Sequence, residues 1–275
     1  MEQKNPVLRL VESAIMIALA TVLSILPLVH LPYGGSITMA SMLPLLIIAY
    51  RHGTTWGIFC GLVYGIIQML LGLKNFSYVP QTFVFFVVLA LLDYLVAFTV
   101  IGFGGSFRRV KNQASGMVLG AVLLSVLRYA CHVLSGYTVW ASFELSKAGL
   151  LYSLSYNATY MLPEMLILMI AAYYIGSFLD FRRNGIHMLP STERNTKSPV
   201  LGVVGGMLIA GSVIFDVVHI FSKLQNPDSG ELDVTMLAQV NWIMIAAVTA
   251  VALVAGVTLF IVQRQINKEA NKDPQ

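Results

Sequence analysis

Residues 83–98 read FVFFVVLALLDYLVAF, an apolar run in which Asp93 is the one charged residue. The run extends on both sides to a span near 82 to 104, which is long enough to cross a bilayer as a helix. A charge in the middle of such a helix is costly unless it has a partner, so it marks a functional site by default. The stretch therefore predicts a membrane-spanning helix that carries a buried acid.

The rest of the chain has the same character. Of its 275 residues 57% are hydrophobic and 11% are charged, and its mean hydropathy is +0.77, far from the composition of a soluble domain. These values predict an all-α, polytopic membrane bundle. Apolar windows place spans near 7 to 29, 38 to 50, 54 to 73, 82 to 104, 115 to 139, 155 to 181, 199 to 222 and 239 to 263. The second is short, and Pro44 is expected to interrupt it.

Basic residues predict the orientation, because short loops rich in Lys and Arg stay in the cytoplasm. With eight spans, thirteen of them fall on one side: Lys4, Arg9, Arg51, Arg108, Arg109, Lys111, Arg182, Arg183, Arg194, Lys197, Arg264, Lys268 and Lys272. Both termini are thus expected to be cytoplasmic. The net charge of +4 follows from this topology and gives no reason to expect nucleic-acid binding.

The longest polar stretch divides the chain. We expect a six-helix substrate-binding core over residues 1–183, a cytoplasmic linker over 184–198 and a two-helix extension over 199–275. Small residues recur every fourth position in several spans, as at Gly57, Gly61 and Gly65, which favours close packing between helices. In the extension, Asp216 and His219 share one helix face, which is most simply a polar contact within the bundle.

The fifth span carries a line of polar and small residues. Arg128, His132, Gly136 and Trp140 are four residues apart, so they form one slightly drifting helix face. At the rise of an α-helix, His132 lies roughly 12 Å below Trp140 and Arg128 roughly 18 Å below it. Gly136 is expected to leave a gap for a flat ring. This face is typical of a ligand pocket.

The sixth span continues the polar cluster with Tyr152, Tyr156, Asn157 and Glu164. An amide both donates and accepts, so Asn157 suits a heterocycle with ring nitrogens and an amino group. It can equally bridge two helices. Trp and Tyr also collect at membrane interfaces, and we interpret Tyr78 and Tyr156 as such anchors.

Two interpretations of Asp93 stay open at this stage. It can form an ion pair with Arg128, which lies at a similar depth, or it can recognise a cationic or amino-bearing ligand. Enzymatic functions are disfavoured, because the chain contains no H-E-x-x-H, G-x-S-x-G or Walker sequence. Cys60 and Cys131 have neither disulfide nor metal-ligand spacing. No cofactor and no metal are expected, and ATP hydrolysis cannot come from this chain.

Four segments together resemble a known family. RYACHVLSGYTVW (128–140), YSLSYN (152–157), LLDYLVAF (91–98) and YGGSITMASMLPLLIIAYRHG (33–53) are similar to the thiamine-specific S components of energy-coupling factor (ECF) transporters. The similarity covers roughly residues 8 to 182, and the spacing of eight residues from His to Trp and five from Tyr to Asn is fairly specific.

The resemblance implies a bacterial cell-membrane protein that captures thiamine from outside without chemistry. It would then dock on a module of one transmembrane coupling protein and two ATPases, and Ala14 and Ala18 resemble the small-residue face used for docking. The matched substrate-binding positions are Asp93, Tyr94, His132, Trp140, Tyr152 and Asn157. Arg128, Tyr33 and Glu164 are candidate supporting residues.

Two departures from the family are visible. Asp93 stands where some members have Glu, and Gly35 stands where some have a Trp that stacks on the ligand, a role that Tyr33 could take over. Other functions remain open: an S component for riboflavin or a thiamine precursor, a carrier coupled to protons or sodium through Asp93 and Arg128, and a membrane scaffold whose polar residues only hold helices together.

Overall fold

The computed structural model describes residues 6–31, 34–140, 145–182, 186–189, 200–224 and 234–270. The chain forms two compact units, Met1–Glu193 and Arg194–Gln275. The first unit contains, in chain order, α1 (Pro6–Ile25), β1 (Pro27–His30), β2 (Ser36–Thr38), α2 (Leu43–His52), α3 (Thr54–Leu71), η2 (Leu73–Tyr78), α4 (Phe83–Leu89), η3 (Ala90–Val96), α5 (Ala97–Thr99), η4 (Val100–Phe107), α6 (Gln113–Ser135), η5 (Gly136–Trp140), α7 (Lys147–Phe178), β3 (Leu179–Asp180) and β4 (His187–Met188). The second contains α8 (Val200–Leu224), η6 (Val234–Gln239) and α9 (Trp242–Ala270).

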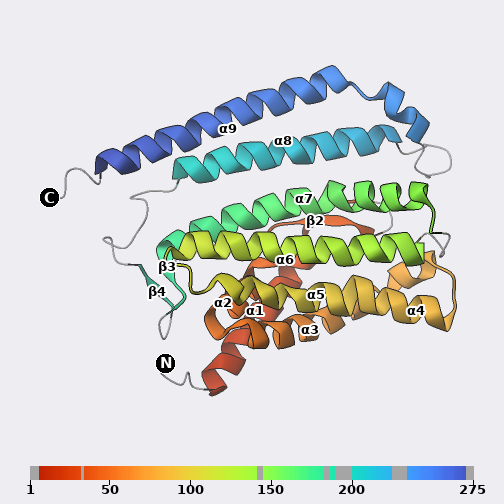
Figure 1. Ribbon diagram of the computed structural model, residues 1–275, viewed down its shortest axis with the longest axis horizontal. Coiled ribbons are helices and arrows are strands. Elements are labelled where there is room, and N and C mark those ends of the chain that lie inside the picture. Colours follow the sequence, from red (N-terminus) through yellow and green to blue (C-terminus); the bar gives the residue numbers. More distant parts are fainter. Residues whose placement is uncertain are drawn as a thin grey trace. The chain divides into compact units, whose positions relative to one another are not determined.

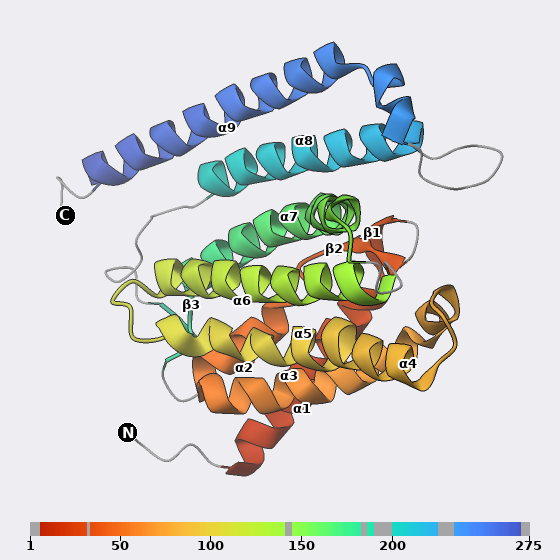
Figure 2. The ribbon, with the colours of Figure 1, turned by 45° about the vertical axis from the view of Figure 1, so that its right-hand side comes forward.

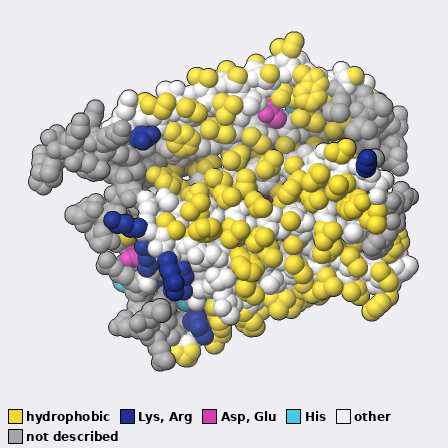
Figure 3. All heavy atoms as spheres, viewed as in Figure 1, with side chains coloured by type: hydrophobic (Ala, Val, Ile, Leu, Met, Phe, Trp, Pro, Cys, Tyr) yellow, Lys and Arg dark blue, Asp and Glu magenta, His cyan; other side chains and the backbone are white. Residues whose placement is uncertain are grey.

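The helices of the first unit run side by side as a bundle (Figures 1 and 2). Within the described residues, seven helices are long and apolar enough to cross a membrane. The fold is therefore the expected polytopic helical bundle. In Figure 3 the Lys and Arg side chains of this unit gather mostly at the end where α2 ends and α6 begins, the end predicted to face the cytoplasm.

The expected second span is wrong in its extent. Residues Ser36–Thr38 form β2, which pairs antiparallel with β1 (Val29 opposite Ile37), and α2 has only 10 residues. Pro44 does not interrupt this helix; it lies in the first turn, where a residue without an N–H is tolerated. A hairpin and a short buried helix thus connect α1 to α3.

Two long helices of the bundle contain wide turns. The residues Ala90–Val96 (η3) and Gly136–Trp140 (η5) are π-helical, and such turns occur often at functional sites. Helix α7 carries Pro163 in its interior, where it removes one helical hydrogen bond. These irregularities lie in the same segments as the polar residues that the sequence singles out.

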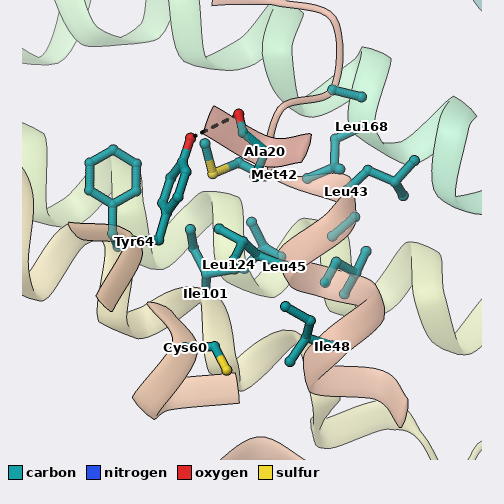
Figure 4. Packing of buried hydrophobic residues seen from close by; sticks show 14 of the residues in the cluster. Ala20, Met42, Leu43, Leu45, Ile48, Cys60, Tyr64, Ile101, Leu124 and Leu168 are labelled. Carbon is teal, nitrogen blue, oxygen red and sulfur yellow. Dashed lines mark hydrogen bonds between the residues drawn. The ribbon is translucent and has the colours of Figure 1, made fainter. Parts of the chain in front are cut away.

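The core of the first unit is apolar and closely packed. Figure 4 shows Leu45 of α2 beside Ile101 and Leu124, all fully or almost fully buried. The hydroxyl of Tyr64, buried among them, donates to the backbone oxygen of Ala20 over 3.3 Å. This bond satisfies a polar group that would otherwise be costly in hydrocarbon.

The glycine stripe on α3 is used for intramolecular packing, as the spacing predicted. A Cβ at Gly61 would overlap the backbone oxygen of Phe98, and one at Gly65 would lie 2.9 Å from the backbone oxygen of Tyr94. Helix α3 therefore contacts the Asp93-bearing helix backbone to backbone. This close contact fixes where that helix can lie.

We expect Gly61→Ala to lower the stability of the purified protein by about 1 to 3 kcal/mol, the usual cost of overpacking. The matched control is Gly211→Ala in α8, because nothing lies within 4 Å of a Cβ at Gly211. That change should leave the stability unchanged or raise it, since Ala favours helix over Gly. Thermal unfolding in detergent measures both, and an equal midpoint for the two variants would contradict this account of the packing.

In the second unit, α8 and α9 pack through glycine. A Cβ at Gly205 would lie 2.8 Å from the backbone oxygen of Gly256. Thr249 of α9 donates to Oδ2 of Asp216 in α8 over 2.5 Å, which is the polar contact predicted for that acid. The helices are thus joined by small residues and by a partly buried hydrogen bond.

Candidate ligand-binding site

Asp93 is held by two residues of the long helix formed by α6 and η5. It lies on the π-helical η3 with its side chain 15% exposed, and its Oδ1 is 3.0 Å from Nδ1 of His132 on α6. Its Oδ2 accepts a hydrogen bond from the indole Nε1 of Trp140 on η5 over 3.1 Å. The structure therefore brings together three residues that the sequence singled out, separated by up to 47 positions.

The two ring nitrogens of His132 differ in their hydrogen bonding. An ionised carboxylate only accepts, so Nδ1 carries a proton when it bonds to Asp93. Nε2 is buried and has no hydrogen-bond partner within the described ranges. A buried polar atom without a partner is costly, so Nε2 is a natural contact for a bound ligand.

Asn157 joins α7 to α6. Its Nδ2 donates to the backbone oxygens of Ser153 (2.9 Å) and His132 (3.3 Å), and its Oδ1 accepts from the hydroxyl of Tyr160 over 2.6 Å. Of the two interpretations of this amide, the helix-bridging one describes these contacts. Asn157 thereby fixes the backbone of the helix turn that carries His132.

The gap expected at Gly136 is not present. A Cβ there would overlap Oγ of Ser153, whose hydroxyl donates to the backbone oxygen of Val133 over 2.8 Å. The space beside Gly136 is thus filled by α7. The glycine allows a close approach of two helices and does not house a ring.

Of the two interpretations of Asp93, the ion pair with Arg128 is not formed in the structure. Arg128 bonds instead to Glu164 on α7, with NH1 and Oε2 3.3 Å apart and both side chains buried. The other oxygen of Glu164 accepts a short hydrogen bond from the hydroxyl of Thr38 on β2. The sequence could not show that α7 places Glu164 opposite Arg128.

The hydroxyl of Tyr94 bonds to other residues than the carboxylate of Asp93, its neighbour in sequence. Its hydroxyl accepts from Nδ2 of Asn75 (3.1 Å) and donates to the backbone oxygen of Gly72 (3.2 Å), and its ring stacks on Phe76 at 5.7 Å. These contacts attach η2 to the bundle. Tyr33, the other aromatic residue considered for this end, lies outside the described residues.

Tyrosines of α7 form a wall next to this cluster. Tyr152 is 48% exposed and its ring stacks on that of Tyr156 at 6.0 Å and 9°. The hydroxyl of Tyr156 accepts from the backbone N–H of Gly35 over 3.2 Å. A Cβ at Gly35 would lie 2.8 Å from that hydroxyl and 3.1 Å from Tyr160, so the position has no room for a Trp side chain.

Sequence reasoning missed three contributors. Tyr160 is buried, bonds to Asn157 and lies edge-on to the ring of His132 at 6.4 Å. Tyr78, interpreted as an interface anchor, has its ring centroid 6.5 Å from that of Trp140. Thr38 bonds to Glu164 from the hairpin. The spacing of Asn157 and Tyr160 along one helix was the available signal for Tyr160; none pointed to Thr38.

The candidate docking residues lie elsewhere. Ala14 and Ala18 are exposed on α1, on a face that also exposes Val11, Ile15 and Val22. The opposite face of α1 contacts the bundle, where Glu12 bonds to Arg51 over 2.7 Å. The two alanines are thus available to another protein or to lipid.

The charges of the site do not balance. With a neutral imidazole, Asp93, Glu164 and Arg128 sum to one negative charge, and no Lys or Arg side chain in the described part of the chain bonds to Asp93. The described residues contain no group of His, Cys, Asp and Glu that could hold a metal ion. An unbalanced carboxylate beside an indole ring and an imidazole is suited to a planar cation.

A bundle with seven helices long and apolar enough to cross a membrane, among the described residues, defines an integral membrane protein. The family model described as "Thiamine transporter protein (Thia_YuaJ)" matches residues 10–180, and the chain belongs to this family. It is therefore a multi-pass cell-membrane protein of a transport family and not an enzyme.

Individual relatives agree with this assignment. A protein named thiamine transporter ThiT from Bacillus subtilis (strain 168) is 37% identical over 180 residues, which cover 61% of this chain and 89% of the relative. Thiamine transporter ThiT from Lacticaseibacillus paracasei is 26% identical over 175 residues (57% and 81%). The solved structure of ThiT from Listeria monocytogenes superposes with a TM-score of 0.50 at 26% identity, covering 62% of this chain and 93% of that one. Helices α8 and α9 lie outside the family match.

Proposed function

We propose that this chain is the thiamine-binding membrane subunit of a vitamin uptake transporter. Family membership supports the proposal, and the observation that carries it is the Asp93 carboxylate, which hydrogen-bonds to His132 and Trp140 and has no Lys or Arg partner among the described residues. Thiamine has a permanently cationic thiazolium ring and an aminopyrimidine. A carboxylate that has no Lys or Arg partner and lies beside aromatic rings is complementary to that cation.

The geometry of these side chains supports the following proposed contacts. Asp93 offsets the cation or accepts from the amino group, His132 contacts the thiazolium side through Nε2, and Trp140 stacks on a ring. Tyr152 adds an aromatic wall with Tyr156. Asn157 acts by holding the helix turn of His132.

For uptake, we propose that the loaded chain docks on a separate ATP-driven module, a transmembrane coupling protein with two ATPases. The sequence contains no ATP-binding motif, so active uptake needs a partner or an ion gradient. The exposed face of α1 around Ala14 and Ala18 supports a docking role, because small residues let helices approach closely.

A ligand panel tests the binding proposal. Calorimetric titration of the purified chain with thiamine, riboflavin and the free aminopyrimidine should show tight binding of thiamine alone. Tight riboflavin binding without thiamine binding would replace the proposed ligand. Failure to bind any of the three would favour a scaffold.

Reconstitution tests the energy source. Vesicles that contain the chain together with the coupling protein and ATPases should accumulate thiamine only when ATP is inside. Vesicles that contain the chain alone should not accumulate thiamine under a proton or sodium gradient. Gradient-driven accumulation by the chain alone would contradict the docking proposal and leave the binding proposal standing.

A further inference from the structure

The bundle buries a second acid and a base near Asp93. Arg128 and Glu164 are 6% and 5% exposed, and removing such groups from water costs several kcal/mol each. Arg128 lies one helical turn from His132 on α6, so the guanidinium is on the side of α6 where the imidazole holds Asp93. Two carboxylates and one guanidinium thus share this part of the bundle.

Arg128 pairs with Glu164 and not with Asp93. NH1 of Arg128 bonds to Glu164 over 3.3 Å, whereas the oxygens of Asp93 bond to His132 and Trp140. Nε of Arg128 is buried without a hydrogen-bond partner in the described segments. Its guanidinium carbon lies 5.0 Å from the ring centroid of Phe98, a residue of α5 that follows Asp93 in the same long helix.

Glu164 is itself held in place from a third element. Its Oε1 accepts a hydrogen bond from the hydroxyl of Thr38 on β2, and the hydroxyls of Thr38 and Ser41 are 2.7 Å apart. Because the single proton of Thr38 goes to the carboxylate, Ser41 supplies the proton for the second bond. Thr38 and Ser41 are buried, at 4% and 0% exposure, so the position of Glu164 is well determined.

We propose that Glu164 is a positioning residue for ligand recognition: by binding Arg128 it keeps the guanidinium away from Asp93, whose negative charge is thereby reserved for a cationic ligand. This inference rests on the proposed function and adds a determinant of its charge selectivity. Glu164 acts through Arg128 and does not need to touch the ligand. Without it, the buried guanidinium would have Asp93 as its remaining nearby acid among the described residues of the bundle.

Binding measurements with two ligands test this role. The probes are thiamine and a neutral isostere in which carbon replaces the thiazolium nitrogen. Glu164→Gln should weaken thiamine binding about fivefold, through competition between Arg128 and the ligand for Asp93, and should change binding of the neutral isostere less than twofold. Removing the competitor as well, in Arg128→Met/Glu164→Gln, should restore thiamine binding.

Matched variants guard against trivial effects. Glu12→Gln alters another acid–arginine pair, partly buried and on α1, and should not affect either ligand. If Glu164→Gln fails to fold, Thr38→Val removes the hydroxyl that orients Glu164 without leaving a buried charge unpaired. That variant should weaken thiamine binding less than Glu164→Gln does, and it too should weaken thiamine binding more than binding of the neutral isostere.

The outcomes separate two failures. If the wild-type chain does not bind thiamine, the proposed function is wrong. If the wild type binds thiamine but Glu164→Gln weakens both ligands equally, or if the double variant is no better than the single one, Glu164 is only a structural residue and the inference is overturned.

Discussion

Asp93→Asn is expected to weaken thiamine binding at least tenfold, about 1.4 kcal/mol. The amide keeps the size of the side chain and can still accept from Trp140, but it removes the negative charge that offsets the thiazolium. Because the site is largely shielded from water, a charge there is screened less than on the surface. Titration calorimetry on the purified variant measures the change.

A second membrane-embedded acid provides the control for this result. Asp216→Asn alters an acid in α8, outside the segment shared with the transporter family, where the carboxylate bonds to Thr249. It should leave thiamine affinity unchanged. Equal affinity of the Asp93→Asn variant and the wild type, both folded, would remove Asp93 from the site.

Trp140→Ala should also weaken thiamine binding at least tenfold, about 1.4 kcal/mol. The indole contributes burial of a ligand ring, about 0.5 to 1.5 kcal/mol of stacking beyond that burial, and attraction of a cation by its π face. The change also removes the N–H that holds Oδ2 of Asp93. The loss therefore combines a missing wall with a less well-ordered acid.

Trp242→Ala serves as the matched variant, because Trp242 begins α9 in the second compact unit and is 52% exposed. Equilibrium titration of both variants with thiamine separates a local effect from a general one. A Trp140→Ala protein that binds as tightly as wild type would show that indole stacking is not part of recognition.

Hydropathy and spacing predicted the helical bundle and the residues of its polar cluster, because span length and bilayer thickness are coupled. They failed where backbone geometry departs from a regular helix. Eight residues of α-helix turn by about 800°, which leaves Trp140 roughly 80° away from the direction of His132. The π turn of η5 changes that rotation, and a helical wheel drawn at about 100° per residue cannot represent it.

The ion-pair partner of Arg128 could not be predicted, for a different reason. Arg128 and Asp93 lie at similar depths in the membrane, which made them candidate partners, but the actual partner depends on how α7 and β2 pack against α6. Glu164 reaches Arg128, and Thr38 reaches Glu164, across 126 positions of sequence. Such contacts are a property of the packed bundle and not of any single segment.

The wide turns at Ala90–Val96 and Gly136–Trp140 also bear on how this chain can vary. A π turn accommodates one residue more than an α-helical turn. Deleting one residue there would let the wide turn close to an α-helical one, so that the later side chains keep roughly their direction and the change stays within the turn. The same deletion in a regular part of either span would rotate all later side chains by about 100° around the axis. These two turns are therefore the places where either span can change its length by one residue with the least effect on the packing beyond them.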